Sequence, residues 1–272
     1  MLTPKNLTIT KEFVTQRIGA VPQLGIILGS GLEEVAGLLK NPKIIPYASI
    51  PYFVRPTIPG HPGKIVFGDF ADKKILILQG RPHYYEGYSL EQTTYPVRLL
   101  SALGIKTLLT TGAAGAVKNH LKLGDLVLLK DHLNLFAENP LRGSQNWDKN
   151  IFLDLSQLYS LRLRKLLLSI SKKLGMIVHQ GVYAFMPGPT YETGAELGVI
   201  RKTGADVVAM SIVPENIVAY QEGMEVSSLV YVANRTGITK YKTTHEDVLR
   251  AGKEAGKKFI KILQELIKSA KF

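Results

Sequence analysis

The amino-acid sequence predicts an α/β fold, a single-domain αβα sandwich with a central mixed β-sheet flanked by helices. Short apolar runs that are typical of buried strands alternate with helical patterns along all 272 residues. Two neighbouring runs are arranged as a hairpin, so the sheet should contain antiparallel as well as parallel pairs. Neither a Pro/Ser-rich linker nor a fixed-period repeat divides the sequence. We therefore expect residues 1–272 to form one domain.

Each expected strand is a short apolar run with Gly, Pro or polar turn residues beside it. In chain order the strands are Leu24–Leu28, Lys64–Phe70, Lys74–Gln79, Thr107–Thr111, Leu126–Leu129, Val182–Met186, Val207–Met210 and Ser227–Ala233. The second and third of them flank Ala71 and Asp72, which we interpret as the turn of the hairpin.

Helices are expected between these strands. In chain order they run from Ser89 to Gly104, over Leu155–Leu174, around Glu196–Lys202, from Pro214, and from about His245 to the C-terminus. The first begins with Ser89 and Gln92 at the spacing of a capping box, and the last with Thr243 and Glu246 at the same spacing. The segment Leu155–Leu174 carries apolar residues three and four positions apart, which favours a long helix with one buried face.

Composition excludes several classes of protein. The sequence has no cysteine, so disulfides, thiolate metal sites and thiol nucleophiles are excluded. The N-terminal residues lack the apolar core of a signal peptide, and no later run is long enough to span a membrane. We therefore expect a cytoplasmic protein with no membrane partner. The histidines lack the spacing of metal ligands, so no metal is expected.

The net charge of +12 raises the question of a nucleic-acid partner. However, the basic residues are spread along the sequence, and the densest group lies in the last predicted helix beside Glu254 and Glu265. That pattern is typical of a solvated helix face. Because no basic run is interleaved with aromatic residues, we expect no nucleic-acid partner and favour a small anionic substrate.

Polar residues follow the predicted strands, where ligands bind in open α/β sheets. The first strand is followed by Gly29, Ser30 and Gly31, and a helix is expected to begin near Glu33. A glycine turn before a helix can point backbone N–H groups at an anion. The same pattern is also typical of an ordinary tight turn with a serine cap.

The stretch ILQGRPHYYEGYS places unusual chemistry after a strand. The planar guanidinium of Arg81 suits a phosphate because it can donate two parallel hydrogen bonds. The structural alternatives are, for Arg81, an ion pair with Glu86 or with the sheet end and, for Tyr84 and Tyr85, aromatic packing under the loop. His61 lies in IPGHPGK, between glycines and prolines, and we expect its ring to be exposed at a rigid loop tip.

Later strand ends supply the other candidates. The stretch TTGAAGA, residues 110–116, is expected to leave its strand through small residues, which would let a ligand lie against the backbone. The remaining candidates are Tyr191, Glu192, Met210, Ser211, Asn234 and His245. Each has an ordinary alternative, such as a helix-start carboxylate, a core methionine, a serine cap or a turn asparagine. Together the residues predict a pocket for an anionic group and a planar polar ligand.

A set of motifs now supports a family resemblance: GIILGSGL, IPGHPGK, GRPHYYEGYS, TTGAAGAVKNHLKLGDLVLLKDHLNL, NPLRG, MPGPTYET, AMSIVPE, VANRTG and THEDVLRAG. In this order and spacing, from about Leu24 to Gly256, the sequence resembles the trimeric class of purine nucleoside phosphorylases. The resemblance implies a homotrimer with the nucleoside phosphorylase fold. It also implies reversible phosphorolysis of purine nucleosides, in which inorganic phosphate is the co-substrate and no cofactor is needed.

The resemblance also implies roles for individual residues. The phosphate site would consist of Ser30, His61, Arg81, His83, the backbone of Ala113, and Ser211. The ribose site would consist of Tyr85, Met210, His245 and, from a neighbouring subunit, Phe152, for which Trp147 is a rival. The base site would consist of Tyr191, Glu192 and Asn234. The catalytic residues would be His83, Glu192 and Asn234. Glu86 would orient His61 or its neighbours.

The chemistry of the base-site residues favours 6-oxopurines such as those of inosine and guanosine. An ionised Glu192 can accept from N1–H, whereas Asn234 can donate to O6 and accept from N7. A preference for xanthosine, adenosine or methylthioadenosine stays open, as does a non-catalytic nucleoside-binding protein. Two features depart from the family: Gly112 stands where an asparagine is usual, and residues 144–152 match poorly.

Overall fold

The computed structural model describes residues 2–135, 138–143, 147, 149–235 and 245–272, with the backbone alone for residues 245–249. Its strands are β1 (Leu24–Leu28), β2 (Lys40–Pro46), β3 (Lys64–Phe70), β4 (Lys73–Gln79), β5 (Thr107–Ala116), β6 (Leu126–Leu133), β7 (Val178–Phe185), β8 (Val207–Ala209) and β9 (Glu225–Arg235). Its α-helices are α1 (Pro4–Ile18), α2 (Leu90–Ala102), α3 (Leu161–Lys173), α4 (Gly194–Lys202), α5 (Val213–Gln221) and α6 (His245–Ser269). The 3₁₀ helices are η1 (Glu33–Leu38), η2 (Tyr47–Ser49) and η3 (Tyr84–Glu86).

The described strands form one mixed sheet in the order β2-β3-β4-β1-β5-β8-β7-β6-β9. A further pairing joins β5 to β9, so the part of the sheet from β5 to β9 closes on itself while the part from β2 to β1 stays open. Strand β5 belongs to both parts, because it runs parallel to β1 and β9 and pairs with β8 near its end. The carboxyl ends of β1, β5 and β9 therefore meet at one edge of the sheet.

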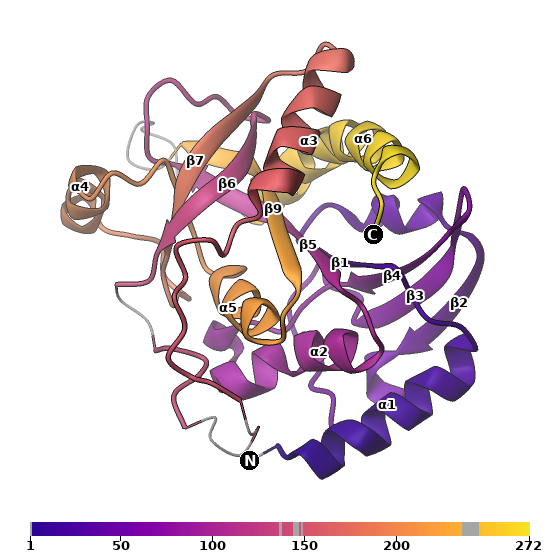
Figure 1. The fold of residues 1–272 in the computed structure, drawn as a ribbon. Coiled ribbons are helices and arrows are strands. Elements are labelled where there is room, and N and C mark those ends of the chain that lie inside the picture. Colours follow the sequence, from indigo (N-terminus) through magenta and orange to yellow (C-terminus); the bar gives the residue numbers. More distant parts are fainter. Residues whose placement is uncertain (1, 136–137, 144–146, 148, 236–244) are drawn as a thin grey trace.

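Helices cover both faces of the sheet, which confirms the predicted sandwich (Figure 1). One buried cluster packs the sheet against α1, α2 and α5, and a second packs it against α3 and α6. Neighbouring residues of β1 enter different clusters: Ile27 faces the first, whereas Ile26 and Leu28 face the second. This alternation explains why β1 is a continuous apolar run, since both of its faces are buried.

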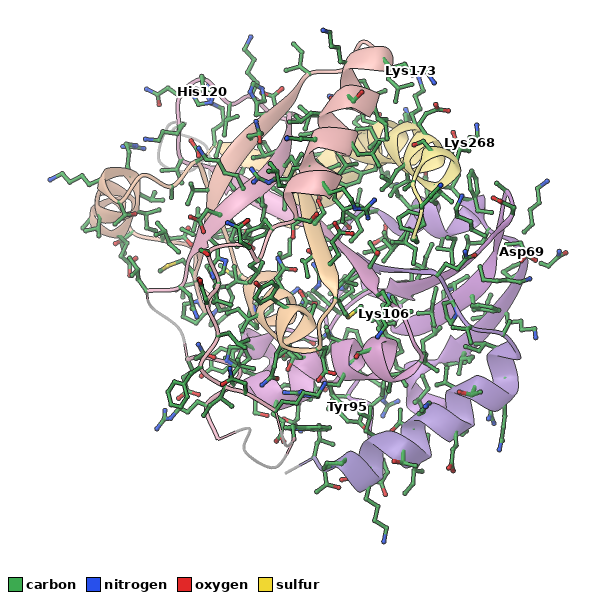
Figure 2. All side chains as sticks on the ribbon, in the orientation of Figure 1. Asp69, Tyr95, Lys106, His120, Lys173 and Lys268 are labelled. Carbon is green, nitrogen blue, oxygen red and sulfur yellow. The ribbon has the colours of Figure 1, made fainter. Side chains whose placement is uncertain are left out.

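Helix α6 carries its basic residues toward solvent. Lys257 pairs with Glu254 at 3.1 Å, and Glu265 is contacted both by Lys268 and by Lys173 of α3. Figure 2 labels Lys173 and Lys268 at adjoining ends of the two helices. These pairs fit the interpretation of this surface as a solvated face. Among the described residues, no helix is both long and apolar enough to cross a membrane.

The long helix predicted over Leu155–Leu174 is wrong at its start, because α3 begins at Leu161. Tyr159 instead forms a β-bridge with Val226, and Ser160 caps the helix by accepting a hydrogen bond from the Leu163 N–H. Tyr159 is buried, so a tertiary contact overrides the helical periodicity of the preceding residues.

Other predicted boundaries also need correction. The helix expected near Glu33 is the short 3₁₀ helix η1. Residues 110–116 do not leave a strand but continue β5, and Asn234 lies within β9 rather than in a turn. The helix α1, the strand β2 and the short 3₁₀ helices η2 and η3 were not predicted. Helix α1 carries a detectable signal, because Thr3 and Asn6 form a capping box and Gly19 ends the helix with positive φ. The capping box expected from Thr243 and Glu246 lies outside the described residues.

The close approach of β1 and β5 predicts a large effect of one methyl group. A Cβ at Gly29 would lie 2.6 Å from the Cα of Gly112 and 2.9 Å from the carbonyl oxygen of Thr111. Both contacts are with backbone, so Gly29→Ala must push the strand ends apart. We expect the free energy of unfolding in urea to fall by about 1–3 kcal/mol.

The matched control is Gly198→Ala, because a Cβ at this position in α4 meets nothing within 4 Å. Alanine is the better helix former, so this change should leave the free energy of unfolding unchanged or raise it by up to about 1 kcal/mol. Equal effects of the two substitutions would contradict the close packing of β1 on β5.

Candidate active site

A cavity at the edge where the strands end brings the predicted residues together. It encloses about 740 Å³ of space, part of it open to solvent. The predicted residues that line it are Ser30, His61, Arg81, His83, Tyr85, Ala113, Tyr191, Glu192, Met210, Ser211 and Asn234. His61 lies in the loop before β3, and the others follow or lie in β1, β4, β5, β7, β8 and β9, so segments far apart in the sequence contribute to one site.

Arg81 is buried at the base of this cavity, and only 3% of its surface is exposed. Its Nε donates to Oε1 of Glu215 at 2.8 Å, and its Nη1 donates to the carbonyl oxygen of Thr111 at 2.7 Å. The alternative of an ion pair with Glu86 is therefore wrong. Glu215 was not identified from the sequence. The signal that could have identified it is its place in AMSIVPE. It lies three residues after Ile212, at the spacing of a capping box, and it caps the start of α5.

The expectation that His61 is exposed is also wrong, because 6% of its surface is exposed. Its Nδ1 lies 2.8 Å from the backbone N–H of Arg81 and must accept that hydrogen bond. The proton of a neutral ring is therefore on Nε2, which can donate to Oγ of Ser30 at 2.8 Å. The hydroxyl hydrogen of Ser30 is then available for another acceptor, such as an anion in the cavity.

His83 is oriented by Glu86. Oε1 of Glu86 lies 2.7 Å from the backbone nitrogen of His83 and 2.9 Å from its Nδ1. An ionised carboxylate only accepts hydrogen bonds, so Nδ1 carries the proton of the ring. The ring of Tyr85 stacks on that of His83 with centroids 4.7 Å apart, and the ring of His61 lies 4.8 Å away. Glu86 therefore orients a neighbour of His61 rather than His61 itself.

The ionisation of this pair follows from its surroundings. Burial lowers the pKa of His83, and the hydrogen bond with Glu86 offsets that effect only in part. For Glu86, burial alone would raise the pKa of the carboxyl, but hydrogen bonds from His83 and Thr57 outweigh it and lower the pKa. At neutral pH the pair is thus a neutral imidazole and a carboxylate. The Nε2 atom of His83 then carries a lone pair.

The other wall of the cavity suits a flat polar ligand. Tyr191 is 52% exposed, Glu192 is partly buried beside it, and Asn234 comes from β9. Burial raises the pKa of the Glu192 carboxyl. Tyr85 and Met210 both approach Gly188, where a Cβ would lie 3.1 Å and 2.5 Å from their side chains.

Gly112 lines the same cavity next to the arginine. A Cβ here would lie 3.4 Å from Nη1 of Arg81 and 3.2 Å from Cδ1 of Ile212. A Cβ would be tight against Ile212 and in van der Waals contact with Arg81, so glycine leaves space beside the buried guanidinium. This extra space is the structural consequence of having Gly112 where the family usually has an asparagine.

Two predicted ribose residues are not part of the cavity as described. Phe152 is 87% exposed on the surface of the chain and does not line the cavity. The side chain of His245 lies outside the described part of the structure. Trp147 is 6% exposed, and its ring centroid lies 4.3 Å from the Cζ of Arg98, so it is buried in its own chain. In the described part of the chain, no group of three or more His, Asp or Glu side chains could hold a metal ion.

Comparison with known proteins gives a consistent result. Residues 23–268 match the family described as the phosphorylase superfamily. Purine nucleoside phosphorylase 1 of Geobacillus stearothermophilus is 39% identical over 260 residues, which cover 95% of this chain and 95% of that protein. Two crystal structures of Schistosoma mansoni purine nucleoside phosphorylase are 35% identical to this chain. The complex with adenosine has a TM-score of 0.94 and covers 99% of both chains; the complex with inosine has a TM-score of 0.93 and covers 99% of this chain and 98% of that one.

The environment of His83 predicts its titration. We expect its pKa to lie below the ordinary histidine value of 6.5, because burial disfavours the charged ring. Glu86→Gln removes the carboxylate that favours the imidazolium, so the pKa of His83 should fall further. An NMR titration of the histidine ring signals measures both values, and His83→Asn identifies the resonance. A wild-type pKa above 6.5, or a higher pKa in Glu86→Gln, would contradict this arrangement.

Proposed function

The chain belongs to the phosphorylase superfamily, and on this premise we propose that it catalyses the reversible phosphorolysis of purine (2′-deoxy)ribonucleosides. The products are the free base and (deoxy)ribose 1-phosphate, so the enzyme is a pentosyltransferase of purine salvage. The observation that carries the proposal is the single cavity in which donors suited to an oxyanion and groups suited to a purine line the same space. We treat residues 1–272 as one domain, because one sheet connects all parts of that cavity.

The phosphate half of the proposed site contains Ser30, His61, Arg81, His83, the backbone of Ala113, and Ser211. Phosphate is the nucleophile, so the protein needs no pair of glycosidase carboxylates. It must hold the anion under the sugar while the bond from C1′ to N9 breaks and positive charge develops on the ribose. Arg81 suits this role because its ion pair and its bond to Thr111 fix the guanidinium before the ligand arrives.

The base half contains Tyr191, Glu192 and Asn234. The electrons of the breaking glycosidic bond move into the purine, and the developing negative charge is relieved as N7 takes up a proton from solvent water, to which the cavity is partly open. Asn234 can accept a hydrogen bond from that N7–H and donate to O6, while ionised Glu192 accepts from N1–H. This polarity favours inosine and guanosine, since adenosine has no N1 proton and has a donor at position 6.

A homotrimer is part of the proposal. The phenyl ring of Phe152 is almost fully exposed to solvent in the single chain, and contact with a second copy would bury it. We propose that Phe152 completes the ribose site of a neighbouring subunit, alongside Tyr85, Met210 and His245. A monomeric mass in light scattering would contradict this assembly. The cytoplasm, which supplies nucleosides and inorganic phosphate, is the proposed compartment.

Phosphate dependence tests the proposed reaction most simply. Incubation with inosine and phosphate should release hypoxanthine and ribose 1-phosphate, and omission of phosphate should abolish the release. The same assay with guanosine, xanthosine and adenosine ranks the substrates. Release of hypoxanthine at an equal rate without phosphate would show hydrolysis and would rule out phosphorolysis.

The polarity of Asn234 predicts a change of specificity. Asn234→Asp presents acceptors where O6 of a 6-oxopurine needs a donor, and these acceptors match a 6-amino group. The ratio of kcat/KM for adenosine to that for inosine should rise by about ten- to a hundredfold. The control is Asn234→Ala. It should lower kcat/KM for inosine, by raising the activation free energy about 3–4 kcal/mol, without favouring adenosine. An unchanged ratio in Asn234→Asp would contradict the proposed base site.

A further inference from the structure

We propose that Glu215 is the positioning residue of the phosphate site, because its single carboxylate holds both the Arg81 guanidinium and the turn that carries Ser211. The inference rests on the proposed function, since both residues are assigned to phosphate there. Glu215 lies in the first turn of α5 and is buried behind the cavity, which it does not line. It therefore acts through its two partners and not on the substrate.

The first contact fixes the arginine. Nε of Arg81 donates to Oε1 of Glu215 at 2.8 Å, and their side chains are 3% and 7% exposed. Nη1 also donates to the carbonyl oxygen of Thr111 and Nη2 to that of Ile27, so three of the five N–H groups of the guanidinium are committed to the protein. A buried cation without a counter-charge is strongly disfavoured. Glu215 thus supplies the counter-charge, holds Arg81 in one orientation while the site is empty, and leaves the remaining N–H groups for an oxyanion.

The second contact fixes the turn after β8. Ile212 has φ 72° and ψ −52°, and the N–H of Val213 bonds to the carbonyl oxygen of Ser211 at 2.8 Å. These values describe a γ-turn of the rarer, strained hand, centred on a β-branched residue that strongly disfavours positive φ. The N–H of Ile212 donates to Oε2 of Glu215 at 2.9 Å, and the hydroxyl of Tyr183 donates to the Ser211 carbonyl. These bonds hold Ser211 at the cavity against the strain.

Both contacts require a carboxylate. The Nε–H of Arg81 and the backbone N–H of Ile212 are donors, and each needs its own acceptor. Ionised glutamate has two acceptor oxygens, whereas a glutamine amide has one oxygen and one donor NH₂ group. Glu215→Gln is nearly isosteric but leaves one of the two partners facing a donor. One substitution therefore disturbs the placement of Arg81 or Ser211 without creating a cavity.

The chain offers a matched control at the other end of the same helix. Glu222 directly follows α5 and pairs with Arg98 at 2.6 Å, with side chains 6% and 3% exposed. Neither residue lines the cavity. Glu222 also pairs with Lys149. Glu222→Gln therefore weakens the ion pairs of a carboxylate of similar burial at the end of the same helix, without contact to the proposed phosphate residues.

The experiment compares wild type, Glu215→Gln and Glu222→Gln. Binding of inorganic phosphate is measured by calorimetry, and KM is measured for phosphate and for inosine. We expect both variants to have a lower Tm. In Glu215→Gln the Kd and KM for phosphate should rise by about ten- to a hundredfold, with KM for inosine changed by less than about twofold. In Glu222→Gln all three constants should stay within about twofold of wild type.

The outcomes separate the two proposals. Absence of phosphate binding in the wild type would remove the proposed function and this inference with it. If the wild type binds phosphate but the two variants have equal Kd and KM values for phosphate, the inference alone is overturned. Glu215 would then have only a structural role. Should Glu215→Gln not fold, Glu215→Asp serves instead, because it keeps the charge but is one methylene too short to reach both partners. It should raise the Kd for phosphate, and a wild-type Kd would overturn the inference.

Discussion

A buried guanidinium needs a counter-charge and hydrogen-bond acceptors, and in this protein that need ties three parts of the fold together. Arg81 follows β4, its counter-ion Glu215 belongs to α5, and the carbonyl group that accepts from Nη1 is that of Thr111 in β5. The cavity lies where these elements meet. The anion binding that we propose for it therefore does not rest on an isolated positive charge, but on donors whose directions the fold sets in advance.

Strand β5 imposes the second constraint. Because it pairs with β1, β8 and β9, its carboxyl end is crowded by backbone on several sides. Gly29 approaches Gly112 too closely for a side chain at Gly29, and Gly112 leaves room beside Arg81. Small residues at this point thus satisfy the packing of the sheet, and as a consequence they expose backbone to the cavity. Close strand packing and access of a ligand to the backbone therefore both need small residues at this point.

Much of the site could be predicted from the sequence, because its residues follow strands and strand ends in such a sheet converge on one edge. What sequence reasoning could not supply is the partner of each residue. Arg81 has a carboxylate five positions away in Glu86, yet it pairs with Glu215, 134 positions away, and Glu86 pairs with His83. His61 has the composition of an exposed loop around it but is buried by that same arginine loop. Such contacts depend on the tertiary fold and leave no local pattern.

The same limit explains the errors in secondary structure. Helical periodicity continues through Tyr159, but the β-bridge to Val226 excludes a helix there. Strand β2 has mostly exposed residues and so lacks an apolar run. The central claim is that an oxyanion and a purine bind in one cavity, close enough for a ribose to bridge them. A crystal structure with phosphate and hypoxanthine tests it directly. The account predicts phosphate within hydrogen-bond distance of Arg81 and Ser211, and hypoxanthine between Glu192 and Asn234. Ligands in two separate cavities would contradict it.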